Sequence, residues 1–123
     1  MFANTKAFSG FAVDDVPRAK AFYRDVLGLP VTEEHGMLHL KLATGAEILV
    51  YPKPGHVPAS YTILNFPVTD IEAAVDELVG RGVVFQRYAG FDQDDRGIFR
   101  AEGPYIAWFT DPAGNVLSVL QER

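Results

Sequence analysis

The stretch AWFTDPAGNVLSVL, residues 107–120, decides the fold of this chain. Its two ends are short apolar runs rich in aromatic and branched residues, which are typical of β-strands. Between them, Asp111-Pro112-Ala113-Gly114 has the chemistry of a tight turn. Proline presets φ at the second position, aspartate accepts hydrogen bonds from the following amides, and glycine tolerates a positive φ. The stretch therefore predicts a β-hairpin.

The pattern that leads to this hairpin occurs twice along the chain. In each copy a strand is followed by an aspartate, Asp15 or Asp70, that suits a helix N-cap, and by apolar residues at helical spacing. The first helix is expected to end at Gly28 and the second at Gly80. Outside the closing hairpin, the segments predicted as strands are 8–13, 30–35, 37–43, 46–52, 61–68 and 83–88.

The two copies differ in length. Asp15 matches Asp70 at an offset of 55 residues, whereas Gly45 of the first closing turn matches Gly114 at an offset of 69. The difference (69 − 55) is 14 residues, which fit between the second helix and the last hairpin. Residues 89–103 are therefore predicted to be an insertion that forms one loop or an extended arm.

Composition narrows the class of protein. The chain has 123 residues, of which 48% are hydrophobic and 22% charged, as expected for one globular domain. A net charge of −5 argues against nucleic-acid binding, which needs a clustered basic face. The absence of cysteine excludes disulfides, zinc–thiolate sites and cysteine nucleophiles. No signal-peptide or membrane-span pattern is visible, so a cytoplasmic protein without a membrane partner is expected.

Three segments carry a family resemblance. FAVDD (11–15), AKAFYRDVLGL (19–29) and FTDPAGN (109–115) resemble the vicinal oxygen chelate superfamily, which includes glyoxalase, bleomycin resistance proteins and extradiol dioxygenases. The resemblance implies an α+β fold of two βαβββ modules that form half-barrels around a cavity. It implies one domain over residues 1–123, with modules at about 6–53 and 61–123 joined by the proline-rich linker 54–60.

Strand alternation then predicts which residues face that cavity. Phe11 and Val13 are expected to meet a helix, so their neighbours point the other way. The residues predicted to face the cavity and bind a ligand are Phe8, Ala12, His39, Glu47, Leu49, Tyr51, Ile63, Asn65, Ile106, Trp108 and Ser118.

The resemblance also implies where a metal would bind. Metal-dependent members hold their ion on the first and last strands of each module, at positions that correspond here to Phe8, Leu49, Ile63 and Ser118. Three of these side chains are hydrocarbons, and a serine is a poor ligand. Glu47, two residues along the same face, does not complete a site by itself. We therefore expect no metal and no other cofactor, and we assign no catalytic residue.

Three functional hypotheses follow. The first is a metal-free homodimer that binds a small apolar or aromatic molecule, as antibiotic-resistance members of the family do. The second is a glyoxalase-like lyase or isomerase, or a dioxygenase, that uses Glu47, His39 or an off-register metal. The third is a dimeric ferredoxin-like barrel, which the paired Asp-capped helices and the two terminal hairpins disfavour.

Some residues leave two interpretations open. Trp108 is either core or a stacking platform for a ligand. His35 and His56 lie in turn and linker contexts, where solvated side chains are expected. The insertion is either a solvated loop or a flap whose arginine reaches an anionic group of the ligand. Its charged residues are Asp92, Asp94, Asp95, Arg96 and Arg100.

Overall fold

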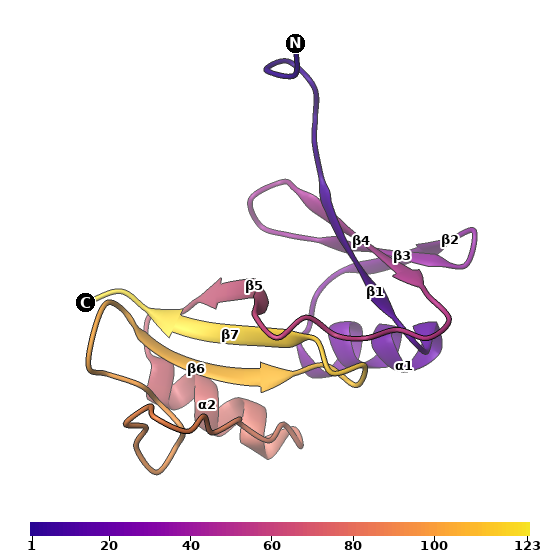
Figure 1. Cartoon of the computed structure of the whole chain (residues 1–123). Helices are drawn as coiled ribbons and strands as arrows, with labels where there is room; N and C mark the ends of the chain where they lie inside the picture. Colours follow the sequence, from indigo (N-terminus) through magenta and orange to yellow (C-terminus); the bar gives the residue numbers. More distant parts are fainter. The chain divides into compact units, whose positions relative to one another are not determined.

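The computed structural model describes all 123 residues, which form two compact units, Met1–His56 and Val57–Arg123. The first unit contains, in chain order, β1 (Ser9–Val13), α1 (Val16–Ala21), the π-helical turn η1 (Phe22–Val26), β2 (Val31–Glu34), β3 (Met37–Lys41) and β4 (Glu47–Pro52) (Figure 1). The second unit contains β5 (Thr62–Pro67), α2 (Ile71–Gly80), β6 (Tyr105–Thr110) and β7 (Val116–Gln121). Each unit thus has the predicted order of strand, helix and further strands, and the predicted α+β fold class is confirmed.

The sheet of the first unit has the strand order β1-β4-β3-β2, with β1 parallel to β4 and the other pairs antiparallel. Helix α1 lies against one face of it and contacts β3 and β4. On that face the ring of Phe11 meets the ring of Tyr23, with centroids 5.8 Å apart. The fully buried residues of this unit are Val13, Tyr23, Leu38, Leu40 and Val50.

Both helices begin as the sequence predicts. The carboxylate of Asp15 accepts a hydrogen bond from the Arg18 amide at 3.1 Å, and Asp70 accepts one from the Ala73 amide at 3.1 Å. The end of the first helix differs from the prediction, because its last turn is π-helical. There the Leu27 amide donates to the carbonyl of residue 22, five residues back, at 3.1 Å.

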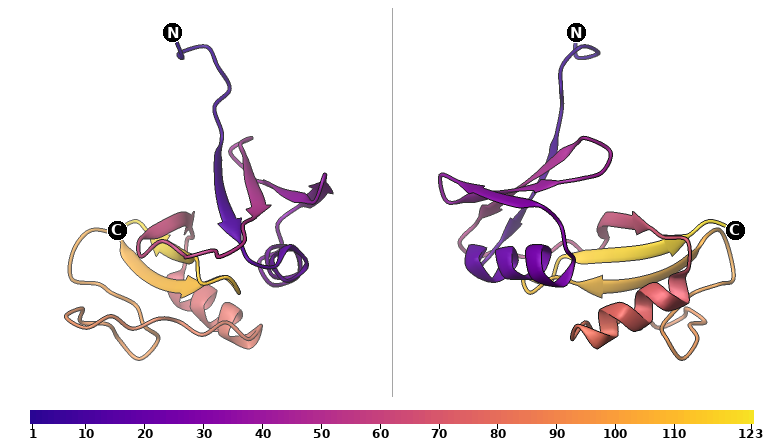
Figure 2. Two further views of the ribbon diagram at one scale, coloured as in Figure 1. Left: turned by 45° about the vertical axis from the view of Figure 1, so that its right-hand side comes forward. Right: turned by 180° about the vertical axis from the view of Figure 1, so that it is seen from behind.

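The sheet of the second unit has the order β5-β7-β6, with β5 parallel to β7 and β6 antiparallel to it. Figure 2 shows α2 lying along this sheet, and it contacts β6 and β7. Pairing of Thr62 with Val116 and of Leu64 with Leu117 leaves Ile63 as the extra residue of a β-bulge. The most buried apolar residues of α2, β6 and β7 are Ile71, Val75, Ala107, Phe109, Leu117 and Val119.

The predicted closing hairpin is confirmed in detail. The Gly114 amide donates to the carbonyl of Asp111 at 3.0 Å, and Gly114 has a φ of 87°. One carboxylate oxygen of Asp111 accepts from the amides of Ala113 and Asn115, both at 2.9 Å. The other accepts from the side-chain amide of Asn115 at 3.0 Å. The buried Asp111 therefore organises the whole turn.

The predicted strand at 83–88 does not form, and this expectation was wrong. One backbone bond joins the segment to β6, from the Gln86 amide to the Trp108 carbonyl at 2.8 Å. The side chain of Gln93 explains the outcome. Its oxygen accepts from the Tyr88 amide at 2.8 Å, and its nitrogen donates to the Gln86 carbonyl at 3.0 Å. These backbone groups are thus satisfied by a side chain rather than by a ladder.

Residues 89–103, called the arm below, are an irregular segment of turns and bends with two isolated bridges. Phe99 exchanges backbone hydrogen bonds with Ile106 of β6, at 2.8 and 3.1 Å, and also pairs with Gln93. Ile98 is completely buried, so the arm is anchored to the unit by its own apolar residue. No helix of the chain is long and apolar enough to cross a membrane.

Candidate functional site

The face of the first sheet that points away from α1 carries no covering element within its unit. By strand register, Gly10 and His39 both lie opposite Leu49, and Ala12 lies opposite Tyr51. Phe8, just before β1, is 68% exposed. This surface, called the open face below, consists of Phe8, Gly10, Ala12, His39, Glu47, Leu49 and Tyr51.

A hollow of about 340 Å³ lies over one end of the open face. Farther along the open face, β1 contributes only the small residues Gly10 and Ala12. A Cβ on Gly10 would lie 3.0 Å from the carbonyl oxygen of Leu49, so the glycine permits close strand approach. Residues that line the hollow include the apolar Ala7, Phe8, Ala46 and Leu49 and the polar Lys6, His39 and Glu47.

The polar side of the hollow is a small charge cluster. His39 Nδ1 lies 3.5 Å from one carboxylate oxygen of Glu47, and Lys41 Nζ lies 3.7 Å from the other. The side chain of His39 is 31% exposed and that of Glu47 is 48% exposed. The cluster therefore combines partial burial with access to a ligand in the hollow.

The equivalent face of the second sheet is polar at its centre. Ser118, which is completely buried, has Asn65 opposite it on one side and Trp108 on the other. The Ser118 hydroxyl donates to the Asn65 side-chain oxygen at 2.5 Å. Ile106 lies two residues from Trp108 on the same strand face, whereas the bulge at Ile63 interrupts the alternation from which its direction was predicted. The Ser118 hydroxyl and the Asn65 side-chain oxygen at this centre are thus hydrogen-bonded to each other.

Aromatic side chains from outside the sheet pack against Trp108. Its ring centroid lies 5.4 Å from that of Tyr88, 5.5 Å from Phe91 and 6.3 Å from Phe99. Phe91 and Phe99, both on the arm, are 5.1 Å apart. Burial in this cluster raises the pKa of the Tyr88 hydroxyl. The arm therefore supplies rings where a planar ligand was expected to stack.

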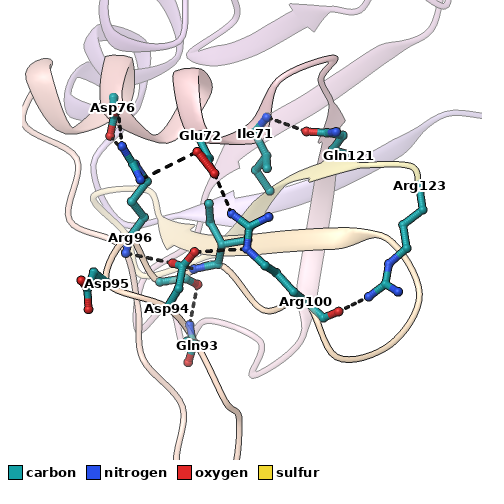
Figure 3. Close-up of polar contacts among 12 residues, drawn as sticks. Ile71, Glu72, Asp76, Gln93, Asp94, Asp95, Arg96, Arg100, Gln121 and Arg123 are labelled. Atoms are coloured by element: carbon teal, nitrogen blue, oxygen red, sulfur yellow. Dashed lines mark hydrogen bonds and ion pairs between the residues drawn. The ribbon is translucent and has the colours of Figure 1, made fainter.

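The arginines of the arm are turned toward α2 (Figure 3). Arg96 makes two hydrogen bonds with the Asp76 carboxylate, at 2.9 and 3.1 Å, and these hold the pKa of Asp76 below its ordinary value. Arg100 bonds to Glu72 at 3.1 Å and to Asp94 at 3.2 Å. These exposed ion pairs attach the arm to the helix, so both guanidinium groups already have carboxylate partners.

Asp94 organises the bend of the arm. Its pKa is lowered overall: desolvation raises it, but the amides of Ile98 and Arg96 and the guanidinium of Arg100 donate to the carboxylate and outweigh that effect. The hydrogen bonds that these two amides donate to Asp94 are both 2.9 Å long. The carboxylate therefore acts as a local structural acceptor.

The predicted site residues thus fall into two groups. Phe8, His39, Glu47 and Leu49 line one hollow, and Ala12 and Tyr51 lie on the same face of that sheet. The remaining predicted residues, all in the second unit, are Ile63, Asn65, Ile106, Trp108 and Ser118.

Sequence reasoning missed several neighbours of these groups. Lys6 and Ala46 line the hollow although they lie outside the strands. The sequence did contain one indication of the ring cluster around Trp108, namely the two phenylalanines of the arm, Phe91 and Phe99. His56, expected to be solvated, is half-buried, and its Nε2 atom is buried without a hydrogen-bond partner.

The residues at the metal positions do not fit a metal ion. Phe8, Leu49 and Ile63 offer no donor atom, and the Ser118 hydroxyl is bonded to Asn65. No three His, Cys, Asp or Glu side chains of the chain are grouped so that they could hold an ion. The polar cluster at the hollow has one carboxylate and one imidazole, which are too few ligands for such a site.

The comparisons with known proteins agree with this architecture. The model of the glyoxalase/bleomycin resistance protein/dioxygenase superfamily matches residues 7–119. The chain belongs to this superfamily. No protein of curated function is similar enough in sequence to be matched.

Solved structures of other proteins share the fold. An antibiotic binding protein, TnmS3 from Streptomyces sp. CB03234, is 21% identical, with 98% of each chain covered and a TM-score of 0.70. A glyoxalase family protein from Enterococcus faecalis is 23% identical, with 98% of this chain and 99% of that chain covered and a TM-score of 0.70. The fosfomycin resistance protein FosX from Listeria monocytogenes is 12% identical, with 95% and 92% covered and a TM-score of 0.71.

Proposed function

We propose that this superfamily member binds a small apolar or aromatic molecule on the open face of its first unit, without a metal ion. The observation that carries the proposal is the hollow of about 340 Å³. Its volume falls in the range of small-molecule sites, which combine apolar walls with a few polar groups. Here Phe8 and Leu49 supply the walls, and His39 and Glu47 supply the polar groups.

The relatives support the class of function rather than a particular ligand. TnmS3 is an antibiotic binding protein and FosX is a fosfomycin resistance protein, so at least one protein of this fold binds an antibiotic. We transfer to this chain only the binding of a compact organic compound. The apolar walls of its hollow favour an aromatic one.

The binding experiment uses two substitutions in the turn between β3 and β4. Ala46 lines the hollow, whereas Ala43, in the same turn and also exposed, does not. Ala46→Phe should fill the hollow and weaken binding of 2-methoxynaphthalene, measured by calorimetry, by at least about tenfold. Ala43→Phe should leave the affinity unchanged. Equal affinities of the two variants, or no binding by the parent chain, would contradict the proposal.

The metal-free part of the proposal has its own test. The protein is purified without chelator, analysed for metals, and titrated with the same probe before and after EDTA treatment. We expect less than one equivalent of any transition metal and unchanged affinity after chelation. One equivalent of zinc, nickel, manganese or iron that is lost together with binding would refute this part.

We also propose that the protein is a homodimer. Val57 and Tyr61 are hydrophobic side chains that are mostly exposed in the single chain. Apolar surface of this kind commonly marks a protein interface. Light scattering in dilute buffer should give twice the chain mass of 13.5 kDa. A mass near the single-chain value would contradict the dimer.

A second function, a metal-free lyase or isomerase, is favoured by one observation, the contact between His39 and Glu47. A carboxylate beside an imidazole is an arrangement that general bases use. Mass spectrometry of a bound compound recovered from the protein distinguishes the two functions. A binding protein returns the compound unchanged, whereas a product that disappears in His39→Gln would favour the enzyme.

A further inference from the structure

The hollow has a directional hydrogen-bonding group on its polar side. His39 Nδ1 faces the carboxylate of Glu47 at 3.5 Å. A carboxylate accepts hydrogen bonds and does not donate them, so in a neutral imidazole this orientation places the hydrogen on Nδ1. The other ring nitrogen, Nε2, then carries a lone pair. A ligand in the hollow therefore meets a hydrogen-bond acceptor.

The surroundings of that acceptor restrict its partner further. Phe8 and Leu49 provide apolar surface beside it, which disfavours a strongly hydrated ligand. Lys6 also lines the hollow, and Lys41 Nζ lies 3.7 Å from Glu47. The ammonium group of Lys6 favours a donor group whose oxygen carries partial negative charge. The matching chemistry is a flat apolar body with one acidic hydroxyl.

We propose that the hollow selects planar aromatic compounds that carry a hydroxyl group on the ring, that is, phenols. The phenol hydroxyl donates to His39 Nε2, and the ring packs against Phe8 and Leu49. Glu47 is a positioning residue, because its carboxylate faces Nδ1 of the imidazole and leaves Nε2 to the ligand. No covalent bond changes in this recognition. The inference rests on the proposed function and adds the chemical class of the ligand.

Two nearly isosteric probes test the inference. 2-Naphthol has a ring hydroxyl, and 2-methoxynaphthalene replaces its hydrogen with a methyl group and cannot donate. Calorimetry near pH ~8, where an ordinary imidazole is neutral, should show 2-naphthol binding about tenfold tighter, which corresponds to about 1.4 kcal/mol. Equal affinities would overturn the inference and leave the proposed function standing. Absence of binding by both probes would overturn both.

Variants locate the preference. His39→Phe keeps an apolar wall and should abolish the preference for 2-naphthol while 2-methoxynaphthalene still binds. Glu47→Gln should reduce the preference. The control is Glu33→Gln, because Glu33 on β2 pairs with Lys20 at 3.2 Å and does not line the hollow. A preference that survives in His39→Phe, or that Glu33→Gln reduces equally, would contradict the assignment.

A spectroscopic readout separates this role from a structural one. In nitrogen-15 spectra of the imidazole, 2-naphthol should move the Nε2 resonance of His39, and 2-methoxynaphthalene should move it much less. His35, in the exposed turn between β2 and β3, is the internal control and should not respond to either probe. An Nε2 resonance that responds equally to both probes would contradict a hydrogen bond to the hydroxyl.

Discussion

The helix-free faces of the two sheets occupy equivalent places in the repeat, yet one is exposed and the other is packed against aromatic side chains of the arm. In the first unit Phe8 is 68% exposed and a hollow lies beside it. In the second unit Trp108 packs against Phe91 and Phe99 of the arm, and Ser118 is completely buried. The arm is the part that the first unit lacks. The insertion thus makes a packed face in the second unit, whereas the first unit, which lacks it, keeps an exposed face with a hollow.

The closing turns of the two units give a second comparison. In the first turn the Leu42 amide donates a hydrogen bond to the Ala46 carbonyl at 3.0 Å. At the matching positions of the second turn, the Asp111 amide donates to the Asn115 carbonyl, also at 3.0 Å. The backbone therefore follows the same course in both turns. Only the second turn has a buried carboxylate that holds its amides.

Removal of that carboxylate should have the largest effect. Asp111→Ala leaves the amides of Ala113 and Asn115 without their acceptor in a buried turn. We expect a loss of about 3 kcal/mol in the free energy of unfolding, measured with urea. The matched change in the first turn is Thr44→Ala, which removes one exposed bond of 3.3 Å to the Ala46 amide. It should cost less than about 1 kcal/mol. Equal losses would show that the turns are equivalent.

The two aromatic residues at the faces should separate stability from binding. Trp108→Ala removes the centre of the ring cluster and should lower the free energy of unfolding by about 2 kcal/mol, less than for a fully buried ring. Phe8→Ala should change it by less than about 0.5 kcal/mol, because the ring is exposed, but should weaken binding of 2-methoxynaphthalene. If Trp108→Ala keeps its stability and loses binding, the ring is instead the stacking platform that the sequence left open.

The attachment of the arm to α2 should give a smaller, pH-dependent effect. Hydrogen bonds from Arg96 hold the pKa of Asp76 below its ordinary 3.8, so the unfolded chain binds this proton more readily. The stabilisation is therefore complete at neutral pH and is lost as the pH falls below that value. The urea midpoints of the parent chain and Asp76→Asn should differ most at neutral pH and draw together only as the pH falls below ~4. A difference that is constant or grows toward acid pH would contradict the role of this pair.

Features that depend on neighbours in sequence were predictable. The caps at Asp15 and Asp70 and the turn at Asp111 each involve residues within four positions, so residue type alone indicates them. The alternation of β3 and β4 also placed His39 and Leu49 on one face.

Features that depend on distant side chains were not predictable. The segment 83–88 fails as a strand because Gln93, beyond its end, takes its backbone groups. The bulge at Ile63 leaves no mark in the apolar pattern. The rings around Trp108 depend on the path of the arm, and the place of Lys6 at the hollow depends on the tertiary structure.

The most direct test is an amide NMR titration of the full chain with 2-methoxynaphthalene. If the open face of the first unit is the ligand site, the largest shifts will fall on Gly10, His39 and Leu49, and the indole N–H of Trp108 will not move. Largest shifts at Asn65, Trp108 and Ser118 would contradict the account. They would show that the ligand displaces the arm and occupies the second sheet instead.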